Sequence, residues 1–331
     1  MTITAPSAAW TQPQIAAARH VSALAARVRL SRAVTPPEWD AELERLTRAR
    51  RAGLVATPGH LYAPQHDGEQ IGDELSRIAD SVGRHDDVSA CISDRAAELA
   101  LEARIAASVG TDRVRLLARA RYRSAPDDDA RAERWSRAYQ DTDEDAETTW
   151  SDDEQDPRSL VCSMRRAVGE RRLAVRVVVH SGMAALAATG DGVIVVAARR
   201  RLRQRDIART VVHEVDGHAV PAALRRALPA HAAFRPAGDS DLEEGRALLI
   251  EQKQGFFDGG RRKELALRHL AACLVHDGAT FDDAADALEA RGAHPTRAVA
   301  IVARASRGGG LGRERVYLPS FWRVTRRVAG L

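Results

Sequence analysis

Two histidines five residues apart, with a glutamate beside the first, place the strongest constraint on this chain. They stand in the segment His213-Glu214-Val215-Asp216-Gly217-His218. In a regular α-helix, residues five apart differ by about 140° around the axis, whereas residues four apart differ by roughly 40°. If both imidazoles share one face, the turn must hold an extra residue, as in a π-bulge, a feature that concentrates at functional sites. The sequence therefore predicts a bulged helix here, eased by Gly217, which has no Cβ to clash in the widened turn.

The residue types in this segment suit a catalytic zinc site. Such a site uses three protein ligands and leaves a fourth position open for water. A second acidic cluster, Asp241-Leu242-Glu243-Glu244-Gly245, follows downstream and can supply a carboxylate ligand. With His213 and His218 as ligands, Glu214 is the natural general base, because metal and carboxylate together generate a hydroxide-like nucleophile at neutral pH. The alternative is a helix that carries two unrelated histidines, one packed and one on the surface.

Patterns around the motif predict the elements that would hold such a site. The β-branched run 192–197 indicates a buried strand, and 173–179 is a second strand candidate. Residues 203–212 follow a helical period that leads into the first histidine, and Asp239-Ser240-Asp241 marks the start of a helix with the two glutamates in its first turn. We therefore expect a mostly α-helical α+β fold, with a gluzincin-like metallopeptidase core and a small β-sheet beside the zinc helix.

The rest of the chain divides by composition into three regions. Residues 1–125 indicate alanine- and arginine-rich amphipathic helices. Residues 126–158 carry a dense acidic run and predict an exposed loop or insertion, or alternatively a lid or rim near the cleft. Residues 159–331 contain the motifs and form the predicted catalytic region. Further helices are expected there at 262–275, 282–290 and 296–305.

Composition argues against several other classes of protein. The three cysteines are scattered and indicate neither a disulfide framework nor a thiol catalyst. The first residues lack the features of a signal peptide and no apolar run is long enough to span a membrane, so we expect a cytoplasmic, bacterial enzyme. A pI of about 9.3 suggests a nucleic-acid-binding protein as an alternative. The 50 basic residues are dispersed, however, and are matched by 46 acidic ones, which argues against it. Gly308-Gly309-Gly310 predicts a turn and not a nucleotide cradle, because no phosphate-binding motif surrounds it.

These motifs resemble those of the tyrosine/tubulin carboxypeptidase-like metallopeptidases, which include the microtubule-associated tyrosine carboxypeptidases and bacterial relatives named for a Gln-Glu-Gly-Leu-Ala motif. That family has the same His-Glu-x-x-x-His spacing. Its second motif is matched by Glu243-Glu244-Gly245-Arg246-Ala247, and its Arg-Gly-rich C-terminal segment by residues 307–317. The resemblance covers Leu173 to the C-terminus and extends more faintly from about Leu75. The departures from the family pattern, which bear on substrate preference, are Arg246, Leu311, Gly312 and Glu314.

The resemblance implies a zinc carboxypeptidase that removes a C-terminal residue, by family likeness an aromatic one, from a peptide or peptide-like substrate with a free C-terminus. In the family a single glutamate directly precedes the glycine, which favours Glu244 over Glu243 as the third ligand. Glu214 would take a proton from the water held by zinc and deliver it to the leaving amine.

Residues near the C-terminus are candidates for the remaining charges. Arg307 and Arg313 could bind the oxyanion or the substrate carboxylate, because a guanidinium grips a carboxylate as a bidentate fork. Tyr317 could hydrogen-bond the tetrahedral intermediate. The alternative for each arginine is a structural ion pair in an arginine-rich chain. A non-catalytic binding protein that has kept the fold is a further alternative, although such a scaffold has no use for Glu214 as a base.

Overall fold

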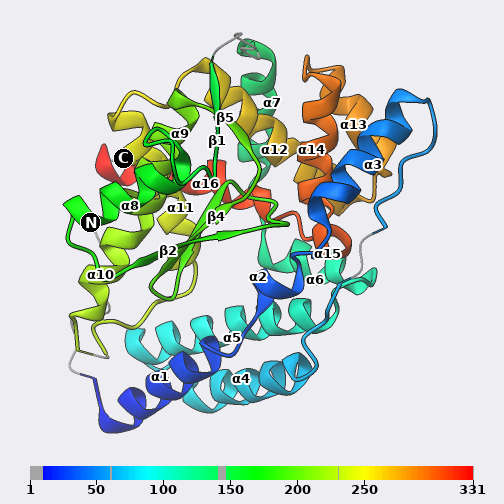
Figure 1. Ribbon diagram of the computed structural model, residues 1–331. Coiled ribbons are helices and arrows are strands. Elements are labelled where there is room, and N and C mark those ends of the chain that lie inside the picture. The colour runs from blue at the N-terminus through cyan, green and yellow to red at the C-terminus, as the bar shows by residue number, and fades with distance from the viewer. Residues whose placement is uncertain (1–9, 60–61, 141–146, 230, 331) are drawn as a thin grey trace.

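Helices dominate the structure, and two small sheets lie among them, as the α+β expectation requires (Figure 1). The computed structural model describes residues 10–59, 62–140, 147–229 and 231–330. In these residues, β1 (Thr148–Trp150) pairs antiparallel with β5 (Arg201–Arg203). The second sheet has the order β2-β4-β3, and its strands are β2 (Arg176–His180), β3 (Ala187–Gly190) and β4 (Val193–Ala197). Strand β2 runs parallel to β4 and β3 runs antiparallel to it.

The N-terminal region is helical, as its composition predicts. Its helices are α1 (Gln12–Ala25), α2 (Leu30–Ala33), α3 (Trp39–Arg51), α4 (Gly68–Val82), α5 (Asp87–Ala107) and α6 (Arg113–Arg121). Helices α1, α4 and α5 form a layer of their own at the bottom of Figure 1, around the buried side chains of Ile71, Leu75 and Ile92. None of the described helices is long and apolar enough to cross a membrane.

The acidic segment departs from the exposed loop predicted for residues 126–158. Helix α7 (Pro126–Ala138) occupies its first part, and its Ala132 is fully buried. The acidic run begins in the first turn of this helix, where the positive end of the helix dipole favours carboxylates. Composition therefore misidentified a helix start as a loop. Residues 141–146, which carry four of the acidic side chains, lie outside the described residues, so the prediction of a lid there is not tested.

The C-terminal half carries the predicted strands and helices. Its helices before the acidic cluster are α8 (Leu160–Glu170), α9 (Gln204–Val211), the π-helix η1 (Val212–Ala219) and α10 (Val220–Arg226). The helix that contains the acidic cluster is α11 (Asp239–Lys253). It is followed by α12 (Gly259–Asp277), α13 (Phe281–Glu289), α14 (Pro295–Ala305), the short turn α15 (Arg307–Gly310), the 3-10 helix η2 (Arg313–Val316) and α16 (Tyr317–Val328). The helices expected at 262–275, 282–290 and 296–305 are thus confirmed as α12, α13 and α14.

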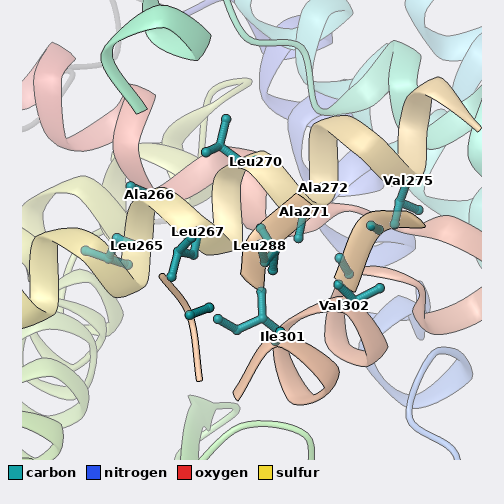
Figure 2. Packing of buried hydrophobic residues seen from close by; sticks show 14 of the residues in the cluster. Leu265, Ala266, Leu267, Leu270, Ala271, Ala272, Val275, Leu288, Ile301 and Val302 are labelled. Carbon is teal, nitrogen blue, oxygen red and sulfur yellow. The ribbon is translucent and has the colours of Figure 1, made fainter. Parts of the chain in front are cut away.

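Helix α12 is the centre of the largest hydrophobic core. Figure 2 shows its Leu267 and Ala271 beside Leu288 of α13 and Ile301 of α14. Helices α7 and α16 also pack against α12. Burying a leucine side chain stabilises the fold by about 1.5–3 kcal/mol, so α12 is held firmly along most of its length. Its polar residues are consequently fixed in position where they reach the cavity described below.

Candidate metal centre

The segment that carries the two histidines is the π-helix that their spacing predicts. Helix η1 continues α9 and leads into α10. Its wider turn brings Nε2 of His213 and Nε2 of His218 to 3.3 Å from one another. Gly217 also has a use that the sequence does not reveal. A Cβ at this position would lie 2.5 Å from the Cβ of Ala247, so the glycine is needed for the close approach of η1 and α11.

Helix α11 brings a carboxylate to the two imidazoles. Oε2 of Glu244 lies 3.4 Å from Nε2 of His213 and 3.5 Å from Nε2 of His218. The neighbouring Glu243 points to Arg225 and Arg235 instead, with its Oε2 2.6 Å from Nη2 of Arg235. Both glutamates lie in the second turn of α11, one turn further from its start than predicted. Of the two, Glu244 alone has the geometry of a ligand beside the histidines.

The three atoms suit a small divalent cation for two reasons, the distances between them and the missing hydrogen-bond partner of Glu244 Oε2. Tetrahedral bonds of about 2.0–2.1 Å from zinc to nitrogen or oxygen place neighbouring ligand atoms about 3.3–3.4 Å apart, which is close to the three separations given above. Oε2 of Glu244 is also buried without a hydrogen-bond partner among the described residues. A buried carboxylate oxygen without a partner is costly, and a cation would supply that partner. The residues present therefore fit the predicted metal.

A second carboxylate of α11 orients the first histidine. The fully buried Glu251 lies with its Oε1 2.7 Å from Nδ1 of His213, and Arg261 donates to both of its oxygens at 2.9 and 3.0 Å. Burial raises the pKa of Glu251, but Arg261 and His213 outweigh burial and hold it at about 2. The ionised carboxylate accepts Nδ1–H, so in the neutral imidazole the lone pair lies on Nε2, toward Glu244 and His218. Glu251 was missed from the sequence, although it follows Glu244 by seven residues and so shares its helix face.

A residue of the edge strand β3 contacts the predicted general base, Glu214, which lies on η1. Oγ1 of Thr189 donates a hydrogen bond to Oε2 of Glu214 at 2.8 Å and contacts its backbone oxygen at 3.3 Å. Glu214 is 8% exposed, so this single bond restricts a side chain that is already enclosed. The small sheet therefore lies beside the histidine helix, as expected. Thr189, which no motif marks, sets the direction of the carboxylate.

A cavity of about 690 Å³ contains these side chains and the C-terminal residues that the sequence singled out. Nη2 of Arg313 donates to Oε1 of Glu244 at 3.2 Å. Nε of Arg307 donates to the backbone oxygen of Arg304, and burial lowers the pKa of Arg307 to about 10. Tyr317 also lines the cavity. The structure thus gathers in one cavity the residues predicted for metal, base and substrate: His213, Glu214, His218, Glu244, Arg307, Arg313 and Tyr317.

Charge in the centre is set by burial and by these contacts. Burial raises the pKa of Glu244, yet His213, His218 and Arg313 hold it well below its ordinary value. Burial lowers the pKa of His213, but the nearby carboxylates of Glu244 and Glu251 outweigh burial and raise it well above the usual range. Glu244 is therefore ionised near neutral pH, as a metal ligand must be. Metal binding here competes with protons for the ligand atoms, so it should weaken as the pH falls.

Comparison with known protein families finds a match over most of the chain. The model of a family described as microtubule-associated tyrosine carboxypeptidase matches residues 50–329. This range includes both sheets, η1, α11 and all the predicted site residues that line the cavity. It begins well before Leu173, where the resemblance that the motifs show begins. No curated protein and no solved structure matches the chain.

Proposed function

The chain belongs to the microtubule-associated tyrosine carboxypeptidase family, and from this premise we propose that it is a zinc-dependent carboxypeptidase. Its substrate is a peptide or peptide-like molecule with a free C-terminus, from which one residue is removed. The observation that carries the proposal is the triangle of His213 Nε2, His218 Nε2 and Glu244 Oε2, with sides of 3.3, 3.4 and 3.5 Å, whose carboxylate oxygen has no other hydrogen-bond partner among the described residues. Glu214 lines the same cavity.

His213, His218 and Glu244 would hold the zinc ion. When bound, zinc supplies a Lewis acid that polarises a carbonyl and lowers the pKa of water. Glu251 and Arg261 keep His213 in the tautomer that presents Nε2. Arg313 holds Oε1 of Glu244 and leaves Oε2 for the ion. These positioning contacts come from α11, α12 and η2, which are tied together by packing.

Glu214 acts as the proton carrier of the reaction. Its Oε2 is occupied by Thr189, and its Oε1 is proposed to accept the proton of the attacking water. The same carboxyl group then delivers that proton to the nitrogen of the leaving residue. Negative charge develops on the scissile carbonyl oxygen, and we assign its stabilisation to Tyr317 and to the donors of Arg313 that Glu244 does not use. Arg307 is proposed to contact the substrate deeper in the cavity.

The residue released is proposed to be tyrosine or another aromatic residue, following the family's description. The cavity is lined by apolar surface as well as by charge, with Leu99, Tyr122 and Leu311 among its buried walls. Such surface suits an aromatic side chain, which gains most from leaving water.

A library of peptides that differ only in their last residue tests this function. Each peptide is incubated with the zinc-loaded protein and its products are weighed by mass spectrometry. We expect loss of a single C-terminal residue, fastest for aromatic residues, and no loss from peptides with an amidated C-terminus. The variant Glu214→Gln should bind zinc but cleave slower by a factor of about 10²–10⁴. Internal cleavage, equal cleavage of amides, or an unimpaired Glu214→Gln variant would contradict the proposal.

A further inference from the structure

One guanidinium in the cavity wall has no hydrogen-bond acceptor among the described residues. Arg268, on α12, is 8% exposed, and its Nε and Nη2 are buried without a partner. The nearest carboxylate oxygen is Oε1 of Glu264, 3.6 Å from Nη1, which is too long for a hydrogen bond. Burial lowers the pKa of this group, and the nearby Arg304 lowers it further. Glu264 supplies a nearby counter-charge, but the two buried donors Nε and Nη2 still lack acceptors, and a buried donor without an acceptor is costly.

Arg261 and Arg304, which also line the cavity, have acceptors, whereas Arg268 has none among the described residues. Nε and Nη2 of Arg261 grip the two oxygens of Glu251. Nε of Arg304 donates to Glu314 at 2.8 Å, and its Nη1 donates to the backbone oxygen of Ala184. The two donors that Arg268 leaves unused, Nε and Nη2, are the same pair with which Arg261 holds a carboxylate. Arg268 thus presents an empty fork of the kind that binds carboxylates in a bidentate manner.

The surroundings hold this fork at a fixed place. Arg268 follows Arg261 by seven residues, so the two lie on one face of α12 about 10 Å apart along the helix. The ring of Tyr317 covers the flat face of the guanidinium, with its centroid 4.5 Å from Cζ. Stacking of this kind orients the plane of the guanidinium. Arg268 lines the same cavity as the two histidines and Glu214.

We propose that Arg268 binds the α-carboxylate of the residue that is released, with Tyr317 as the platform that orients it. This inference rests on the proposed function, since it concerns a substrate with a free C-terminus. It assigns the specificity for the chain end to a residue that no motif marks. Arg307 and Arg313 already donate to protein acceptors, whereas Arg268 does not.

Binding to an inactive protein tests the inference without relying on cleavage. In the Glu214→Gln background, a labelled peptide ending in tyrosine is titrated as the free acid and as the C-terminal amide, and binding is followed by fluorescence anisotropy. We expect the free acid to bind at least about 30-fold more tightly, because a buried charge pair is lost in the amide. Adding Arg268→Met should reduce this ratio to a few-fold. Arg32→Met, which removes the same charge from an exposed position at the cavity rim, should leave the ratio unchanged.

Two further arms separate the possible outcomes. The first arm compares two peptides that end in tyrosine, one with glutamate and one with glutamine as the residue before it. Both should show the same ratio of free-acid to amide affinity. If the affinity instead depends on the glutamate side chain and on Arg268, the fork binds a side-chain carboxylate and the inference is wrong. The thermal midpoint of Arg268→Met should equal or exceed that of the wild type, since no hydrogen bond is lost. Arg304→Met, which loses two acceptors, should unfold at a lower temperature. A midpoint for Arg268→Met as low as that of Arg304→Met would indicate a structural role and overturn the inference.

Failure of the inference can be told from failure of the proposed function. Cleavage of free-acid peptides with an acid-to-amide ratio that Arg268→Met does not change would overturn the carboxylate site and leave the peptidase standing. An Arg268-dependent preference for free acids in a protein that cleaves none of them would do the reverse.

Discussion

Glu244 and Glu251 act on the same histidine from one face of α11. The first faces Nε2 of His213 together with His218, and the second accepts Nδ1–H on the opposite side of the ring. A ligand histidine is usually fixed by such an outer partner, and loss of that partner weakens metal binding. Arg261 in turn keeps Glu251 ionised although it is fully buried.

Removing the charge of Glu251 should weaken zinc binding without abolishing it. In Glu251→Gln the amide can still meet Nδ1, but it no longer favours the tautomer that presents Nε2, so we expect zinc affinity to fall by about 10–100-fold. Competition with a chromophoric chelator measures this affinity. Glu243→Gln is the matched control, since it removes a carboxylate of the same helix that pairs with Arg225 and Arg235 instead. Equal losses in the two variants would rule out a specific role for Glu251.

At the scale of elements, the centre depends on how closely η1 and α11 approach. The π-helix turns both histidines toward α11, and the contact between the two helices leaves no room for a side chain at Gly217. A shift of α11 by a few tenths of an ångström would change the separation between Glu244 and both imidazoles. Position of the ligands is therefore a property of helix packing as much as of the motif.

Adding one methyl group at this contact should disturb both stability and the metal centre. For Gly217→Ala we expect a loss of about 1–3 kcal/mol in the free energy of unfolding, as for other overpacked sites, and weaker zinc binding. Gly169→Ala on α8 is the control, because a Cβ there would meet nothing within 4 Å; it should be neutral or stabilising. Denaturant unfolding measures the stability of both variants, and competition with a chromophoric chelator measures their zinc affinity.

A second substitution can restore the space that the first one fills. Ala247→Gly removes the Cβ that Gly217→Ala would meet, so the double variant should be more stable than the sum of the two single effects. Strict additivity of the two changes, or a Gly217→Ala variant that unfolds like the wild type, would show that this contact does not limit the approach of the helices.

At the scale of the whole molecule, the sequence predicted what depends on local period and failed where distant elements meet. The spacing of His213 and His218 identified η1 because a helix period is local. The acidic run hid α7, since its carboxylates gather at a helix start while Ala132 faces the core. The sequence could not assign roles to Glu251 and Arg268. The partners of Glu251, and the absence of an acceptor for Arg268 among the described residues, follow from the packing of α11, α12 and α16. In a chain this rich in arginine, composition does not reveal which guanidinium lacks an acceptor.

The metal content of the chain tests the central claim most directly. After treatment with a chelator and dialysis against zinc, the wild type and Glu243→Ala should each retain one zinc ion per chain by elemental analysis, whereas Glu244→Ala should retain none. Zinc should also raise the thermal midpoint of the wild type, because an ion that binds only the folded chain stabilises it. A wild type that stays free of zinc, or a Glu244→Ala variant that keeps a full equivalent, would contradict the account.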